Sequence, residues 1–230
     1  MKLFHTLFAP LCLLAFTLHA ADAPAKKRVL LLGDSISIAY TPVVQKLLAE
    51  ELTVLRPMNK AGKAENCSGT TAGVANIDRW LAIDGGKWDV IHFNWGLHDL
   101  KHVKPDTNGA KTSDLATDPP QVTVEVYEKQ LREIVAKLKA TGAKLIFATT
   151  TPVPEGAMKV YRTNADAIRY NEAALRVMKE NHIAVNDLYA FALPKLQEIQ
   201  IQPANVHFTP QGSEVLGAEV VKAIKAALQP

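Results

Sequence analysis

Cysteine is scarce in this chain of 230 residues, which has only Cys12 and Cys67. Cys12 lies within an N-terminal segment that has the features of a removable signal, so the mature chain would keep Cys67 alone. A single thiol cannot form an internal disulfide, and stability must therefore come from the hydrophobic core. The sequence shows no basic partner for Cys67, so we interpret it as a buried bystander and not as a nucleophile.

No apolar run is long enough to cross a membrane, which takes about 20 residues. The longest, Leu7 to Leu18, follows Lys2 and ends near Leu18-His19-Ala20, where a signal peptidase would cut. We therefore expect residues 1–20 to be a cleaved secretory signal, with a cut that could extend to residue 23. This predicts an exported protein, periplasmic or secreted, without stable membrane insertion.

Charge of one sign is not in large excess. The 26 basic and 23 acidic residues give a net charge of +3, and the longest basic run is Lys26-Lys27-Arg28. Nucleic acid is therefore a poor candidate partner. The glycine-rich motifs that bind dinucleotides or nucleoside triphosphates are also absent, so the sequence implies no cofactor.

Short apolar runs alternate with amphipathic segments along the chain. The runs predict strands over residues 28–32, 52–55, 88–93, 144–150 and 182–185. The amphipathic segments predict helices over residues 41–51, 72–81, 122–140, 164–180, 190–199 and 211–228. This alternation predicts one α/β domain over residues 28–230, a three-layer α/β/α sandwich around a five-stranded parallel sheet. In such sheets, ligands bind beyond the carboxyl ends of the strands.

Two polar residues lie at positions suited to nucleophilic chemistry. Ser35 follows the first predicted strand directly, and a serine hydroxyl needs a neighbouring base before it attacks a carbonyl. His207 precedes the last predicted helix on a loop, where a general base would be useful. Taken singly, Ser35 could be a helix cap and His207 an ordinary loop residue. The Gly-x-Ser-x-Gly elbow of lipase-type hydrolases is missing, because Ser37 stands at its fifth position.

Four ordered blocks together resemble the SGNH/GDSL hydrolases. The blocks are Gly33-Asp34-Ser35, Ser68-Gly69-Thr70-Thr71, Gly96-Leu97-His98-Asp99 and the run from His207 to Gly212. The resemblance implies a flavodoxin-like fold in which Ser35 is the nucleophile and His207 its base. It also implies that the backbone N–H groups of Ser35 and Gly69 bind the developing oxyanion, a contribution of about 3–4 kcal/mol per donor.

The sequence departs from the family pattern at two positions. His98 replaces the asparagine that donates to the oxyanion, so either the His98 ring or the nearby amide of Asn94 would complete the oxyanion hole. Ala204 replaces the acid before the histidine. Another group would then orient His207, and the candidates are the side chain of Asn205, a backbone carbonyl and the side chain of Asp187. We favour a neutral group, so that Ser35 and His207 act as a dyad.

Other residues permit different interpretations. His92, His98, Asp99 and His102 could form a metal site, although a core role for His92 and a solvated loop position for His102 are better supported. Trp95 could stack on a pyranose ring or pack in the core. Tyr161 and Arg162 could line a pocket for a sugar or a carboxylate.

We therefore expect an exported serine esterase that forms an acyl-enzyme on Ser35, with a small-molecule or polysaccharide ester as substrate. By the family resemblance, the ester would be an acetyl ester of a carbohydrate. One alternative is a catalytically weak carbohydrate-binding or scaffolding domain on the same fold. Others are a lysophospholipase or lipase-type esterase and a metal-dependent hydrolase.

Overall fold

Five parallel strands form one sheet in the order β2-β1-β3-β4-β5. The computed structural model describes residues 25–105, 107, 109–156 and 159–229, so the expected signal segment, residues 1–20, lies outside the described residues. The strands are β1 (Lys27–Leu32), β2 (Leu52–Leu55), β3 (Val90–Phe93), β4 (Lys144–Ala148) and β5 (Ala184–Asn186). The predicted three-layer α/β fold is confirmed.

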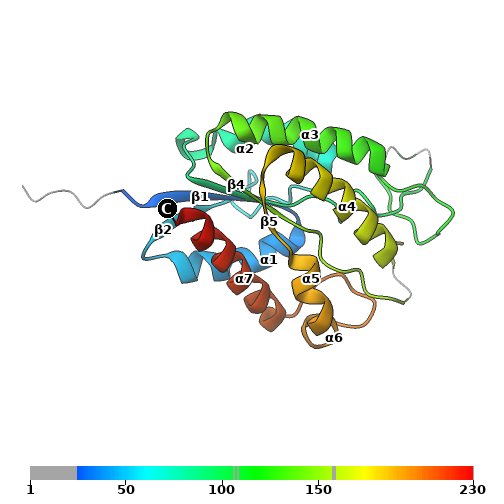
Figure 1. Cartoon of the computed structure of the whole chain (residues 1–230). Helices are drawn as coiled ribbons and strands as arrows, with labels where there is room; N and C mark the ends of the chain where they lie inside the picture. The colour runs from blue at the N-terminus through cyan, green and yellow to red at the C-terminus, as the bar shows by residue number, and fades with distance from the viewer. Residues whose placement is uncertain (1–24, 106, 108, 157–158, 230) are drawn as a thin grey trace, which may run out of the picture.

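Helices cover both faces of this sheet (Figure 1). One face carries α2 (Thr70–Leu81), α3 (Val124–Ala140) and α4 (Asn164–Asn181), and the other carries α1 (Ser35–Leu48) and α7 (Pro210–Leu228). Short helical pieces complete the fold: η1 (Ile83–Gly85), α5 (Leu188–Ala192), η2 (Leu193–Lys195) and α6 (Leu196–Ile199). None of the helices in the described residues has both the length and the apolar character needed to cross a membrane.

The core follows from the apolar strands. Val29 to Leu32 of β1 are fully buried, because β1 lies between β2 and β3 and has helices on both sides. On one face, α1 and α7 approach each other closely at Gly217, where an added Cβ would lie 2.9 Å from the Val43 side chain. This contact joins the first helix of the chain to the last.

Two of the predicted helices differ from the observed elements by more than two residues at an end. α1 begins at Ser35 and not at residue 41, because the buried Asp34 side chain caps the helix by accepting from the Ile36 N–H at 2.9 Å. The single helix predicted over residues 190–199 is three short pieces, α5, η2 and α6, and Pro194 lies in the middle one.

Candidate active site

Ser35 and His207 meet at the carboxyl end of the sheet. Ser35 is the first residue of α1, and His207 lies in the loop before α7. The Ser35 Oγ lies 3.0 Å from the Nε2 of His207, although 172 residues separate them in sequence. A neutral histidine ring that accepts at Nε2 can take the hydroxyl proton in this geometry.

Asn205 holds the far side of the His207 ring. Its Oδ1 lies 2.9 Å from the Nδ1 of His207 and also accepts from the backbone N–H of His207 at 2.9 Å. An amide oxygen can only accept, so Nδ1 carries the proton and Nε2 is free to face Ser35. The preceding residue, Ala204, has the left-handed φ of 59°, which turns the chain so that Asn205 reaches the ring.

The other proposed orienter, Asp187, is bound elsewhere. Its Oδ1 accepts from the Thr149 hydroxyl at 2.9 Å and from the backbone N–H of Ala190 at 3.0 Å, as the N-cap of α5. The structure therefore brings Asn205, and not Asp187, to His207.

The two backbone N–H groups expected to bind an oxyanion have no hydrogen-bond acceptor in the described part of the chain. They belong to Ser35, at the start of α1, and to Gly69, the N-cap of α2. Both lie at helix N-termini, where the dipole favours a negative charge. They are available to an oxyanion.

Asp99 fixes the helix turn that follows Gly69. The Asp99 Oδ1 accepts from the backbone N–H of Thr70 at 2.7 Å and from the Thr70 hydroxyl at 2.6 Å. A Cβ on Gly69 would lie 2.8 Å from the same oxygen, so a side chain there would force the Asp99 carboxylate or the turn to move. Burial raises the pKa of Asp99 to about 7, and its Oδ2 has no partner within the described residues.

The His98 ring is neutral and has one nitrogen available as a donor. Its Nδ1 lies 3.4 Å from the ammonium of Lys101, which can only donate, so the ring proton resides on Nε2. Burial, and then the charges of Lys101, Arg162 and His207, lower the pKa of His98 to about 3. By contrast, the Asn94 amide donates to the Ala148 carbonyl at 2.8 Å, at the end of β4.

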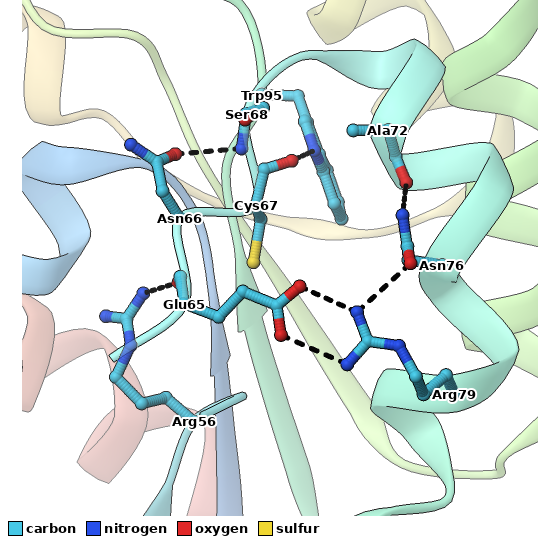
Figure 2. Close-up of polar contacts among 9 residues, drawn as sticks. All are labelled: Arg56, Glu65, Asn66, Cys67, Ser68, Ala72, Asn76, Arg79 and Trp95. Atoms are coloured by element: carbon cyan, nitrogen blue, oxygen red, sulfur yellow. Dashed lines mark hydrogen bonds and ion pairs between the residues drawn. The ribbon is translucent and has the colours of Figure 1, made fainter. Parts of the chain in front are cut away.

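Figure 2 shows the loop that leads into Gly69. Ser68 has the left-handed φ of 53°, and the Asn66 Oδ1 accepts from its N–H at 2.9 Å. The buried Arg56 donates to the Glu65 carbonyl at 2.9 Å, while the Glu65 carboxylate forms a two-armed ion pair with Arg79. These contacts hold the part of the loop that precedes the strained Ser68.

Cys67 and Trp95 belong to the core. Burial raises the pKa of the Cys67 thiol to about 12, so it is not a thiolate at neutral pH. Trp95 is 1% exposed and stacks on Trp80, and its Nε1 donates to the Cys67 carbonyl at 3.4 Å. Trp95 therefore packs in the core and does not offer a face to a sugar.

The residues considered for a metal site are spread out. His92 is fully buried in β3 with its Nε2 3.2 Å from the Asn186 amide, and the ring of His102 packs edge-on against Tyr161. In the described ranges, no three histidine, cysteine or acidic side chains form a group that could hold a metal ion.

Residues 31–215 match the model of the GDSL-like lipase/acylhydrolase family. The chain belongs to this family. Membership in the GDSL-like family supports an ester hydrolase that acts on a small-molecule ester. A search of the curated proteins finds no significant match.

Solved structures with the same fold include other GDSL-like hydrolases. A lipase/acylhydrolase from Enterococcus faecalis is 22% identical with a TM-score of 0.65, covering 89% of this chain and 98% of its own. An acetylxylan esterase from Geobacillus stearothermophilus is 15% identical with a TM-score of 0.62, and the match covers 86% of this chain and 94% of the esterase chain. A second acetyl xylan esterase is 16% identical with a TM-score of 0.62, and the match covers 86% of this chain and 99% of the esterase chain. At these identities the likeness concerns the fold.

Proposed function

We propose that this GDSL-like hydrolase is an exported serine esterase that removes a small acyl group, acetyl, from a carbohydrate. One observation carries the catalytic part of the proposal: the Ser35 Oγ, the His207 ring and the Asn205 Oδ1 form a chain of two contacts of 3.0 and 2.9 Å. The expected signal over residues 1–20 is the basis for export.

The reaction would proceed in two halves. As the Ser35 oxygen attacks the ester carbonyl carbon, its proton moves to the Nε2 of His207. The tetrahedral oxyanion accepts from the backbone N–H groups of Ser35 and Gly69 and from the Nε2–H of His98. His207 then protonates the departing alcohol, and a water activated by the same ring releases the acid from Ser35.

In this mechanism His98 takes the place of the family's asparagine. A second proton would place a positive charge on the Nδ1 side, against the Lys101 ammonium, but the low pKa of His98 keeps the ring neutral across the physiological range, with Nε2–H as its donor. The Lys101 contact sets its tautomer. We therefore assign the third oxyanion donor to His98 and a structural role to Asn94.

An open groove supports the substrate class. It has a volume of about 910 Å³ and includes Ala204, which is close in sequence to His207. The residues that line it include the amides Asn164, Gln197, Gln200 and Gln202 and the charged Glu155, Lys195 and Glu198. Amides bind sugar hydroxyls well. Two structures of the same fold are titled acetyl xylan esterases.

The test compares the wild type with Ser35→Ala on p-nitrophenyl acetate and on acetylated xylo-oligosaccharides. We expect release of acetate by the wild type and a loss of about 10⁴-fold or more in Ser35→Ala. In trapping with a fluorophosphonate, the Ser35 oxygen should displace fluoride, so that the peptide containing Ser35 gains the mass of the phosphonyl group. Equal rates in the two proteins would contradict the esterase hypothesis and favour the alternative of a carbohydrate-binding domain.

Hydrolysis assays also test the lipid alternative. A preference for p-nitrophenyl palmitate or a lysophospholipid over acetyl esters would replace the carbohydrate substrate with a lipid.

Export predicts that the protein expressed from its full gene is recovered outside the cytoplasm and begins at residues 21 to 24. An intact Met1 in the cytoplasm would overturn that part of the proposal.

A further inference from the structure

Two cationic side chains approach the active site from different parts of the chain. Lys101 follows β3 and contacts the Nδ1 of His98 at 3.4 Å. Arg162 precedes α4, and its Nε donates to the Leu97 carbonyl at 3.1 Å, next to His98. A backbone bond of 3.0 Å from the His102 N–H to the Tyr161 carbonyl ties the two segments together.

Their charges act on the residues proposed for catalysis. Besides burial, Lys101, Arg162 and His207 all lower the pKa of His98, so the four groups share one region. Arg162 also interacts with Asp34, the residue before the proposed nucleophile. Both cations are half-buried. The pair therefore lies at the edge of the site and not on a remote surface.

Neither cation forms an ion pair within the described residues. The arginines Arg79, Arg132, Arg169 and Arg176 each bind a carboxylate. The carboxylates whose charges reach the pair are Asp34, which caps α1, and Asp99, which binds Thr70. The two terminal nitrogens of the Arg162 guanidinium make no hydrogen bond in the described ranges.

Burial makes both charges costly. It is the main cause that lowers the pKa of Arg162 to about 10, and burial and then the Arg162 charge lower the pKa of Lys101, while Asp34 and Asp99 act in the opposite direction. Two half-buried cations without an ion pair in the described residues can accept an anionic ligand. A planar guanidinium with two free nitrogens matches a carboxylate or a phosphate, which accepts two parallel hydrogen bonds.

We propose that Lys101 and Arg162 form an anion-binding subsite, and that the preferred substrate is an ester whose alcohol portion carries a carboxylate or a phosphate group. The inference rests on the proposed function, whose substrate it narrows from carbohydrate esters in general to acidic ones. Lys101 serves two purposes in this assignment, since it also sets the tautomer of His98.

The test uses three acetyl esters that share one ring: 4-acetoxybenzoate, 4-acetoxyphenyl phosphate and the neutral methyl 4-acetoxybenzoate. Their leaving groups differ in reactivity, so the measured quantity is the ratio of kcat/KM for each anionic ester to that for the neutral one. We expect Arg162→Gln to lower this ratio about tenfold relative to the wild type, mainly through KM. The more strongly affected anionic ester identifies carboxylate or phosphate as the group bound.

Matched variants separate charge from packing. Arg162→Lys should keep most of the ratio, because it keeps the charge, and Lys101→Gln should lower it if Arg162→Gln fails to fold. Arg169→Gln removes an exposed arginine that pairs with Asp166 and should leave the ratio unchanged. An unchanged ratio in both Arg162→Gln and Lys101→Gln would overturn the subsite.

A binding measurement distinguishes this failure from failure of the esterase. Calorimetric titration of Ser35→Ala with 4-hydroxybenzoate and 4-hydroxyphenyl phosphate requires no turnover. We expect binding of at least one anion that weakens with salt and in Arg162→Gln. If the wild type has no esterase activity but the anions bind in this way, the subsite stands and the proposed function fails. If it hydrolyses esters but no anion binds, the subsite is wrong.

Discussion

Asn205 contacts His207 twice through a single oxygen, at 2.9 Å from the ring Nδ1 and at 2.9 Å from the backbone nitrogen. The same atom thus fixes the ring and the chain that carries it. Because an amide has no net charge, it stabilises a protonated ring less than a carboxylate would. The geometry of a triad is kept with a weaker electrostatic contribution.

Removal of that oxygen should impair turnover strongly. In Asn205→Ala we expect kcat on p-nitrophenyl acetate to fall by between about 10² and 10⁴, the upper figure being the scale for a disabled triad acid. Asn205→Asp keeps an acceptor in place and should stay within about tenfold of the wild type. Asn181→Ala, which removes an amide at the end of α4, serves as the control. Wild-type kcat in Asn205→Ala would show that another group orients the ring.

Gly69→Ala should damage the oxyanion hole more than the fold. The added Cβ would lie 2.8 Å from the Asp99 Oδ1, so the Asp99 carboxylate or the turn that carries the Gly69 N–H must move. We expect kcat to fall by about 10²-fold or more and the free energy of unfolding to fall by about 1–3 kcal/mol. Steady-state kinetics and urea titration measure the two effects.

The control for this variant is Gly73→Ala, in the same helix. There the added Cβ meets the Ile134 and Trp95 side chains, so it strains packing without contacting Asp99. It should lower stability with a much smaller effect on kcat. Equal losses of kcat in the two variants would mean that Gly69 acts through general stability.

Asp99 should make stability depend on pH in an unusual direction. Its pKa is about 7 in the folded chain against a usual 3.8, because burial disfavours the charged form. Between these values the folded state holds a proton that the unfolded state has released. The contribution of Asp99 is therefore complete below about pH 4 and is lost as the pH rises to about 7, by roughly 4 kcal/mol at most.

Asp99→Asn should remove most of this slope. Urea titrations at pH 4.5, 6 and 7.5 would show the wild type losing more stability with rising pH than the variant does. Asp78→Asn changes an exposed carboxylate that pairs with Lys137 and should follow the wild type. Parallel curves for the wild type and Asp99→Asn would exclude a raised pKa for Asp99.

The Cys67 thiol should be unreactive in the native protein. Its pKa of about 12 and its complete burial leave almost no thiolate at pH 8. We expect iodoacetamide to leave Cys67 unmodified and the esterase rate unchanged over an hour, with modification only after denaturation. Mass spectrometry of the peptide that contains Cys67 measures this. Rapid native labelling with loss of activity would give the thiol a functional role.

The strands could be predicted from the sequence because they are buried on both faces and therefore appear as apolar runs. The start of α1 could not, since Ser35 to Tyr40 lacks a clear helical stripe and the helix depends on the Asp34 cap. The segment over residues 190–199 has helical periodicity but is divided around Pro194. Such local boundaries are set by caps and single residues.

The site could be predicted in part. Parallel strands bring their carboxyl ends to one edge, so the proximity of Ser35 and His207 followed from topology together with the family resemblance. The choice between Asn205 and Asp187 could not be made, because it depends on the left-handed backbone at Ala204. The sequence did not indicate a role for Lys101, because only the folded loop places its ammonium against the His98 ring.

The contact between the start of α1 and the loop before α7 has a consequence for biosynthesis. A ribosome must complete nearly the whole polypeptide before Ser35 can contact His207. If the two residues act as proposed, fragments that end before residue 207 should lack esterase activity. The recovery of hydrolysis during refolding would then report the packing of the last helix against the first.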